Sequence, residues 1–568
     1  MANPLFRKKS ITSILEDVKQ GSADGQGSGL KKILGVRDLT SMGIAAIVGA
    51  GIFSTIGTAA YNGGPGISLL FIITAVTCGF SALCYAEFAS RVPIAGSAYT
   101  YAYVSFGELI AWVIGWALIL EYAIGNIVVA ISWSGYFNNL LEGFGLHLPA
   151  WLTTDPSTAK AAYQQVEQAV AQGIPLDESL KFVQNAWHTA PVLFGKHIFI
   201  NLPAFIIVCL ISVLTYIGIK ESKKMTNFLV VFKVLVIIFV IIIGFFYVEP
   251  SNWSPFMPNG FEGVLRGVSA VFYAYIGFDA ISTTAEECKN PQRDLPRAMI
   301  YSLLICTVLY ILISFVLTGM VPFTELKVTD PLAYVFDRVG QKWIGYIVSI
   351  SAVVATTSVL LVFQLGQPRI WMSMSRDGLL PKAFGKIHSR YQTPWFSTIV
   401  TGVIVAIPSL FMASDLMTDL TSIGTLFAFV LVSGGVLMLP RIANLKGDAN
   451  PTGKFRLPYI NGKFIVPILF IIFLFFVRGK ISNNLLNISH EGLQGILFLM
   501  FIALGTVLSI LTFLKNFSII PIMGVLFCSY LLIEIPSQSW IYFFIWVALG
   551  LTIYFSYGYW RSKLAVSK

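Results

Sequence analysis

Residues 44–58 read I-A-A-I-V-G-A-G-I-F-S-T-I-G-T, an apolar run that is interrupted in its middle. Gly49 and Gly51 flank Ala50, and a glycine in a helix interior costs about 1 kcal/mol relative to alanine. The pattern predicts two half-helices separated by an unwound gap at 49–52. The second half-helix would direct free N–H groups and the positive end of its dipole into the gap, which suits a carboxylate. The alternative is a continuous helix whose small residues let a neighbour pack closely.

The composition of the whole chain is that of a membrane protein. Of its 568 residues, 56% are hydrophobic and only 12% are charged, which excludes an ordinary soluble domain. Because a span needs roughly 20 mainly apolar residues, we count about fourteen spans. They lie near 38–60, 65–88, 107–136, 198–219, 226–248, 263–287, 297–321, 342–372, 395–413, 419–439, 463–478, 494–514, 517–534 and 538–557.

The net charge of +10 does not indicate nucleic-acid binding, because the basic residues gather in alternate loops and in the amino-terminal tail. Cytoplasmic loops of membrane proteins carry such an excess of lysine and arginine. We therefore expect a multi-pass protein of the cell membrane, with the lipid bilayer as its partner and both termini in the cytoplasm. The long polar loop 137–197 would lie outside, and residues 157–171 within it predict a short amphipathic helix.

Nothing in the sequence indicates a cofactor or an enzyme. The six cysteines are scattered without C-x-x-C spacing, and no nucleotide-binding or hydrolytic motif is present. We expect no metal site, no cofactor and no catalytic residues.

Two distant spans share a short sequence pattern. The first break reads V-G-A-G-I-F-S-T at 48–55, and the sixth span reads I-G-F-D-A-I-S-T at 276–283. Spans five apart cross the membrane in opposite senses. Glycine-interrupted spans at matching positions of two inverted halves indicate a secondary-transporter site near the bilayer midplane.

Three ionisable residues inside spans are functional candidates, because such groups are costly in a membrane. Lys233 in the fifth span can bind and release a proton, so it is the candidate for proton coupling; the alternative is a lysine that snorkels to the nearby cytoplasmic surface. Glu121 in the third span could face Lys233, a hydroxyl group or a substrate pocket, or form a structural hydrogen bond. Asp279 lies in the sixth-span break, where it would fix the unwound backbone or reach a substrate amine.

Further polar and aromatic side chains have more than one interpretation. Glu87 and Arg91 at the end of the second span, and Glu286 at the end of the sixth, are expected to form inner-gate or interface pairs. Thr356 begins a Thr-Thr-Ser run that could line a pocket, form a sodium site or bond back to its own helix. Aromatic residues just before the second break, Phe272, Tyr273 and Tyr275, could gate a ligand or simply pack.

At these residues the chain resembles the amino acid–polyamine–organocation superfamily, and within it the cationic amino acid transporter branch and its bacterial relatives. The matching stretches are G-A-G-I-F (49–53), Y-A-E-F-A-S-R-V-P-I-A-G-S-A-Y (85–99), F-Y-A-Y-I-G-F-D-A-I-S-T-T-A-E-E (272–287), K-N-P-Q-R-D-L-P (289–296), R-D-G-L-L-P (376–381) and S-I-G-T-L-F-A-F (422–429). Two departures from the pattern are the long outer loop 137–197 and the stretch 459–492.

The resemblance implies an all-α polytopic membrane protein with a LeuT-like five-plus-five inverted repeat and broken first and sixth helices. We expect a cytoplasmic tail at 1–36, a first repeat at 37–248, a second at 262–440, additional helices at 462–557 and a tail at 558–568. It also implies a substrate site around the two breaks. Its expected residues are Ile47, Gly49, Ala50, Gly51 and Ile52 of the first, Phe272, Ala274, Tyr275 and Gly277 of the sixth, with Glu121 and Thr356.

The implied function is proton-coupled import of an α-amino acid by alternating access, with Lys233 and Glu121 as coupling residues. The amides of Gly49, Ala50 and Gly51 would hold the substrate carboxylate, and carbonyls of the sixth span its amine. Small neutral and cationic substrates are both compatible with the sequence. Exchange, sodium coupling and nutrient sensing are the alternatives, and the oligomeric state is open.

Overall fold

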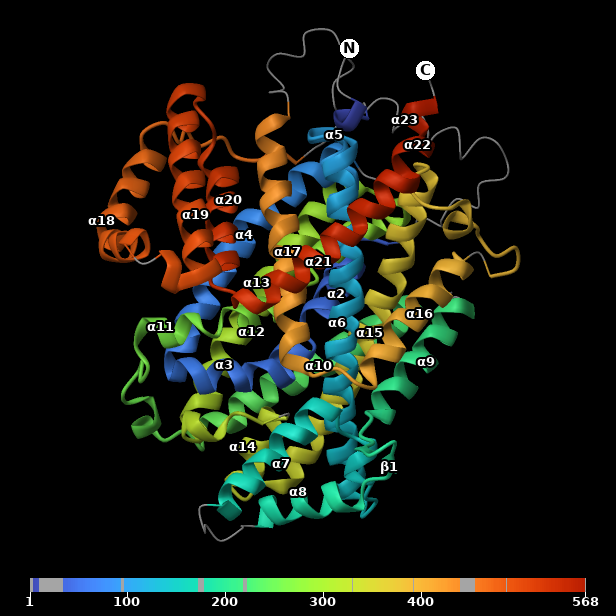
Figure 1. Ribbon diagram of the computed structural model, residues 1–568, viewed down its shortest axis with the longest axis vertical. Coiled ribbons are helices and arrows are strands. Elements are labelled where there is room, and N and C mark those ends of the chain that lie inside the picture. Colours follow the sequence, from blue (N-terminus) through green and yellow to red (C-terminus); the bar gives the residue numbers. More distant parts are fainter. Residues whose placement is uncertain are drawn as a thin grey trace.

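The computed structural model describes residues 4–9, 34–92, 97–171, 178–217, 222–328, 330–391, 393–439, 455–486 and 488–566. It is an elongated bundle of helices, and both ends of the chain lie at the same end of its long axis (Figure 1). In the described ranges the only strands are β1 (Val192–Leu193) and β2 (Lys196–His197), which pair as an antiparallel hairpin. The expected all-α polytopic fold is confirmed.

The first predicted span is broken where the glycines lie. Helix α2 (Val36–Ile47) ends because Val48 adopts an extended conformation, with φ −80° and ψ 95°. The chain resumes as the π-helical turn η2 (Gly51–Thr55) and continues as α3 (Ile56–Gly63). Single π-helical turns are rare and are frequent at functional sites.

The sixth predicted span is interrupted as well. It consists of α11 (Gly260–Leu265) and α12 (Val268–Tyr273), a stretch of turns, and the 3₁₀ helix η6 (Asp279–Glu287). Gly277 in the turns has a φ of +121°, a backbone conformation that side-chain-bearing residues rarely adopt. Both interruptions predicted from the sequence are therefore present.

Long helices surround these two segments. α6 and α15 pack against each other, as do α4 and α13, and α17 packs on α6. The apolar helices of the bundle are α4 (Ile67–Arg91), α6 (Glu108–Gly143), α9 (Leu202–Ile217), α10 (Ser222–Phe245), α13 (Pro291–Met320), α15 (Lys342–Arg376), α16 (Trp395–Ser409), α17 (Ser414–Met438), α18 (Ile465–Leu486), α19 (Ile488–Lys515), α20 (Ile519–Ile533) and α21 (Ser537–Ile553).

The membrane spans of the sequence can be compared with these helices. Among the described residues, nine helical stretches are long and apolar enough to cross a membrane, and one of them, Val36–Arg91, covers the first two predicted spans. Three shorter apolar helices, α9, α16 and α20, coincide with further predicted spans. The one predicted span that matches none of these helices is the sixth, which is broken as described above. The segment predicted at 463–478 is a longer helix, α18.

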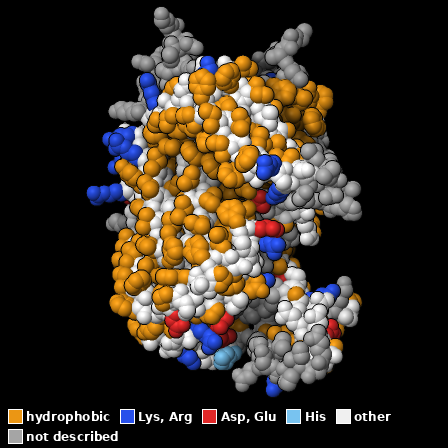
Figure 2. Space-filling model, turned by 90° about the vertical axis from the view of Figure 1, so that its left-hand side faces the viewer, with side chains coloured by type: hydrophobic (Ala, Val, Ile, Leu, Met, Phe, Trp, Pro, Cys, Tyr) orange, Lys and Arg blue, Asp and Glu red, His pale blue; other side chains and the backbone are white. Residues whose placement is uncertain are grey.

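The surface agrees with a bilayer around this bundle. On the flank shown in Figure 2, hydrophobic side chains cover most of the middle of the molecule, and charged side chains lie toward its ends and in a group along one edge. Peripheral helix α18 is exposed over nearly all of its length, with side chains such as Ile471 and Phe476 facing outward. Lipid would cover this apolar surface.

The loop between α6 and α9 forms a small lobe at the end opposite the termini (Figure 1). It contains α7 (Pro156–Ala171), which confirms the predicted amphipathic helix, and α8 (Glu178–Thr189). Trp187 stacks on Tyr163 with ring centroids 4.6 Å apart and also packs on Phe199. These aromatic contacts give the lobe a core of its own.

Candidate functional site

The first break exposes three backbone amides. Val48 N–H still bonds the Ile44 carbonyl at 2.9 Å, and Ile52 N–H bonds the Gly49 carbonyl at 3.2 Å. Between them, the N–H groups of Gly49, Ala50 and Gly51 donate to no backbone carbonyl in the described ranges. Adjacent free amides at the start of a helical segment form an anion site, and the positive end of the helix dipole adds to it.

The sixth-span break supplies the opposite chemistry. Ala274 N–H bonds the Ala270 carbonyl at 3.3 Å, and Tyr275 N–H bonds the Phe272 carbonyl at 2.9 Å. Within the described chain the carbonyls of Ala274 and Tyr275 accept no hydrogen bond from the backbone. Free carbonyl oxygens of this kind can accept hydrogen bonds from an ammonium group.

The two breaks cross in direct backbone contact. A Cβ atom on Gly51 would lie 2.3 Å from Cα of Ala274, and one on Gly277 would lie 2.7 Å from Cβ of Ala46. The Thr55 hydroxyl donates to the carbonyl of Ala270 at 3.1 Å. The glycines are therefore required for the close approach, which places the free amides of one segment beside the free carbonyls of the other.

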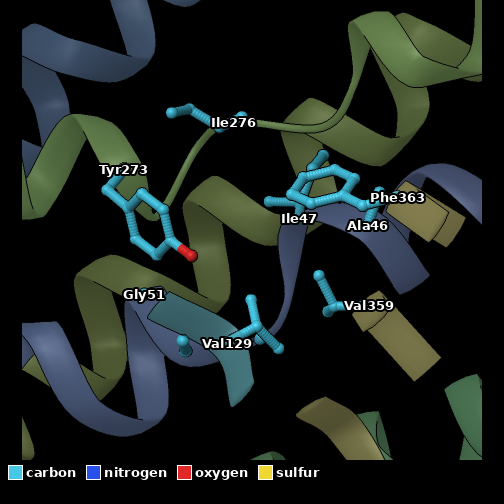
Figure 3. Close-up of a pocket in the computed structure, with 10 residues that line it drawn as sticks. Ala46, Ile47, Gly51, Val129, Tyr273, Ile276, Val359 and Phe363 are labelled. Atoms are coloured by element: carbon cyan, nitrogen blue, oxygen red, sulfur yellow. The ribbon is translucent and has the colours of Figure 1, made fainter. Parts of the chain in front are cut away.

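A cavity lies at this crossing (Figure 3). Its volume is about 10 Å³, the space of roughly one water molecule. Tyr273 comes from the sixth span, Val129 from α6, and Val359 and Phe363 from α15. The cavity is also lined by Ala46, Ile47, Gly49, Ala50, Gly51 and Ile276. Apart from the Tyr273 hydroxyl, the lining side chains are apolar, and the polar groups are backbone.

Lys233 is fully buried next to this crossing. Its ammonium donates to the carbonyls of Ala45 and Val48, at 3.0 and 2.8 Å, and to the hydroxyl of Ser358 at 3.1 Å. The first two acceptors belong to the carboxyl end of α2, the negative end of that helix dipole. Lys233 therefore does not snorkel to the surface. It connects α2, the half-helix that precedes the first break, to α15.

Comparisons with known proteins identify the family of this chain. Residues 34–502 match the family described as "Amino acid permease", and residues 518–562 match its carboxyl-terminal segment. The chain belongs to the amino acid permease family. The resemblance to the amino acid–polyamine–organocation superfamily is thereby confirmed.

Several relatives align over nearly the whole chain. The branched-chain amino acid permease BcaP of Bacillus subtilis is 37% identical over 99% of this chain and 100% of its own length. The methylthioribose transporter of the same organism is 35% identical over 97% of both chains. The vacuolar cationic amino acid transporter 4 of Arabidopsis thaliana is 37% identical over 77% of this chain and 67% of its own. The first of these relatives is named as a permease and the other two as transporters.

Glu121 of this permease is buried but does not line the cavity. It lies two turns of α6 from Val129, about 12 Å along the helix axis. The Thr425 hydroxyl is within hydrogen-bonding reach of its carboxyl, and the buried Asp279 carboxyl is within electrostatic range. No ion pair joins Glu121 to Lys233 in the part of the chain that the structure describes. The sequence left three partners open for Glu121: Lys233, a hydroxyl group and a substrate pocket. The structure places it beside a hydroxyl group, that of Thr425.

Other predicted residues lie away from the cavity. The Thr356 hydroxyl bonds back to the Ala352 carbonyl of its own helix at 2.6 Å, and it stays only a predicted substrate contact. Arg91 pairs with Glu87 through its Nε at 2.7 Å, and the other oxygen of Glu87 accepts the amide of Leu457 at 2.8 Å. This pair therefore fastens the segment before α18 to the end of α4. The Glu286 side chain lies outside the described residues.

The aromatic side chains before the second break divide into two groups. Tyr273 lines the cavity, and its hydroxyl donates to the Gly125 carbonyl at 3.1 Å. The Tyr275 ring instead points to α4, where its hydroxyl donates to the Phe71 carbonyl at 3.1 Å. Phe272 packs edge-on against Phe429. Of these three side chains, that of Tyr273 is the one that lines the cavity.

Sequence reasoning missed the contacts that hold η2 against α6 and α14. Tyr136 in α6 donates a hydrogen bond to the carbonyl of Phe53 in η2, and the two rings pack edge-to-face at 6.0 Å. Short helix α14 (Pro331–Arg338) packs against η2, and Asp330 precedes it. The Asn139 side chain donates to the Asp330 carboxylate at 2.7 Å, and burial raises the pKa of Asp330 to about 6. A tyrosine one helical turn before an asparagine on a long apolar helix is too weak a pattern to predict this.

Proposed function

We propose that this permease imports an α-amino acid with an aliphatic side chain across the cytoplasmic membrane, together with protons. The observation that carries the proposal is the crossing of the two breaks. Three free amides there line a small cavity with mostly apolar walls, and the segment that carries the two free carbonyls packs directly against them at Gly51 and Ala274.

The backbone groups match what all α-amino acids share. A carboxylate would accept hydrogen bonds from the amides of Gly49, Ala50 and Gly51, and an ammonium group would donate to the carbonyls of Ala274 and Tyr275. Charge-assisted hydrogen bonds of this kind are about twice as strong as neutral ones. These contacts would select the class of substrate and leave the side chain to the rest of the cavity.

The cavity walls favour an aliphatic side chain over a cationic one. Val129, Val359 and Phe363 present apolar surface, Glu121 does not line the cavity, and it lies about 12 Å along α6 from Val129. A charged side chain would be desolvated there without a partner, which is costly. The relative named as a branched-chain amino acid permease supports the same substrate class.

The position of Lys233 supports proton coupling. Its ammonium occupies a site formed by the carbonyls of Ala45 and Val48 and the hydroxyl of Ser358, an oxygen-rich set that could otherwise hold a small cation. Loss of the proton would remove the charge that joins α2 to α15, so the half-helix could move. A fixed lysine in this place favours proton coupling over sodium coupling.

The proposed cycle is alternating access around the crossing. A cavity of about 10 Å³ cannot hold an amino acid, so the two breaks must separate when substrate enters. We infer that residues 37–248 and 262–440 form two inverted repeats that move relative to each other, with both termini in the cytoplasm. Helices at 462–557 would be additional to this core.

Competition uptake in proteoliposomes tests the substrate class. Radiolabelled valine is supplied, and unlabelled isoleucine, arginine or methylthioribose competes. We expect inhibition by isoleucine alone. Stronger inhibition by arginine would show a cationic side-chain site, and inhibition by methylthioribose, which has no carboxylate, would contradict the amino acid assignment.

Gradient-driven accumulation tests the coupling ion. We expect an inward proton gradient to concentrate valine in the wild type but not in Lys233→Met, whereas Lys480→Met serves as the control because Lys480 is half-exposed and pairs with Glu534. An unchanged proton response in Lys233→Met, or a requirement for sodium, would refute the coupling role.

A further inference from the structure

The hairpin of the outer lobe presents an unusual surface residue. Phe194 lies at the tip between β1 and β2, and its side chain is 96% exposed. Its φ of +51° lies in the left-handed region, where a bulky residue is strained. A large apolar side chain that is both strained and unpacked gains nothing from the lobe itself, so a contact beyond the lobe would stabilise it.

The segment that follows the hairpin is fastened to two helices at the edge of the bundle. Asn201, the residue before α9, donates its amide to the Leu410 carbonyl just after α16, at 2.9 Å. The half-exposed side chains of Phe411 and Met412 follow directly. Figure 1 shows the hairpin beside the outer end of α9, at the edge of the bundle.

The lengths of these two helices set the level of the bilayer. Helix α9 has 16 residues and α16 has 15, so each spans about 23 Å, whereas the hydrocarbon core is about 30 Å thick. A layer of this thickness centred on the two helices would extend about 3.5 Å beyond each end, to about the level of Asn201 and Met412. Phe194 is only seven residues before Asn201, across a folded hairpin, which places it near the headgroup region.

We propose that the hairpin tip is a membrane anchor: Phe194 inserts into the outer lipid interface and holds the lobe against the bilayer beside α9 and α16. The exposed Val192 on the same hairpin would add apolar contact. Continuity with the lipid-facing surface of the two helices distinguishes this occupant from a protein partner. Partitioning of a phenylalanine side chain would stabilise the docked lobe through the hydrophobic effect.

Site-directed spin labelling of the full-length protein in liposomes tests the anchor. The labels are placed at Phe194→Cys and, as a matched control, at Val170→Cys on the half-exposed face of α7 in the same lobe. The background carries Cys209→Ser, because the other native cysteines are buried. Valine uptake confirms that each labelled protein is folded.

We expect the label at 194 to collide mainly with lipid-soluble oxygen and to lose accessibility to a water-soluble nickel chelate, whereas the label at 170 stays accessible to the chelate. Equal chelate accessibility at both positions would overturn the proposal, because the tip would then lie in water. A label at 194 that is immobilised and shielded from both reagents would also overturn it, since a second protein surface would be covering the tip.

Discussion

Replacement of Gly51 by alanine tests whether the close crossing of the two breaks forms the substrate site. The new methyl group would lie 2.3 Å from Cα of Ala274 and 2.6 Å from its Cβ. Ordinary contacts of a Cβ atom begin at about 3.4 Å, so the two segments must separate by about 1.1 Å. Since the neighbour is backbone rather than a flexible side chain, the segments cannot relax locally.

The expected cost follows from this overlap. Overpacking by a methyl group typically costs about 1–3 kcal/mol. The methyl group would also occupy the space between the Gly49–Gly51 amides and the Ala274 carbonyl that a bridging substrate needs after the breaks separate, so a cost of this size should appear in binding. It corresponds to a weakening of valine affinity by about 5- to 150-fold.

Equilibrium binding of radiolabelled valine to the purified protein measures the effect, with uptake as the second readout. Gly79→Ala is the matched control, because no atom lies within 4 Å of a Cβ there and α4 should gain up to about 1 kcal/mol in stability. We expect Gly79→Ala to bind valine normally. If Gly51→Ala binds and transports valine as well as the control does, the crossing is not the substrate site.

Two further predictions concern the contacts around α14 and the cavity wall. Burial raises the pKa of Asp330 from its usual 3.8 to about 6, so the folded protein holds this proton more tightly than the unfolded chain. Protonated Asp330 therefore contributes about 3 kcal/mol to the free energy of unfolding below about pH 4. This contribution is lost as the pH rises through 6. Melting curves at pH 5 and 7 should therefore differ less in Asp330→Asn than in the wild type, and an identical difference in both proteins would contradict the assignment. Val129→Ala removes two methyl groups from the cavity wall, worth about 1.6 kcal/mol of contact with a valine side chain. Uptake competition should show valine weakened about tenfold relative to phenylalanine, and an unchanged ratio would mean that Val129 does not contact the side chain.

The positions of the two breaks were predictable because glycine is a local signal. The sequence pattern shared by residues 48–55 and 276–283 located both segments, and the opposite crossing senses followed from counting spans. Lys233 was identifiable for a similar reason, since a lone lysine in an apolar helix has few interpretations. Its actual acceptors, Ala45, Val48 and Ser358, come from two other helices and depend on tertiary packing.

Side-chain directions were not predictable in the same way. Tyr273 and Tyr275 are two residues apart, yet one lines the cavity and the other bonds to α4, because the backbone turns between them. Thr356 satisfies its hydroxyl within its own helix, an option open to a threonine at any helical position. The buried aromatic helix α5 (Ser97–Ser105) and the hairpin of the outer lobe have no periodic pattern strong enough to predict them.

The most direct test of the central claim is proton movement driven by substrate alone. Proteoliposomes are loaded with a pH-sensitive dye, with no imposed gradient and no sodium, and valine is added outside. We predict that the interior acidifies as valine enters, and that Lys233→Met abolishes the acidification. Entry of valine without a change in internal pH would contradict proton-coupled import of an aliphatic amino acid.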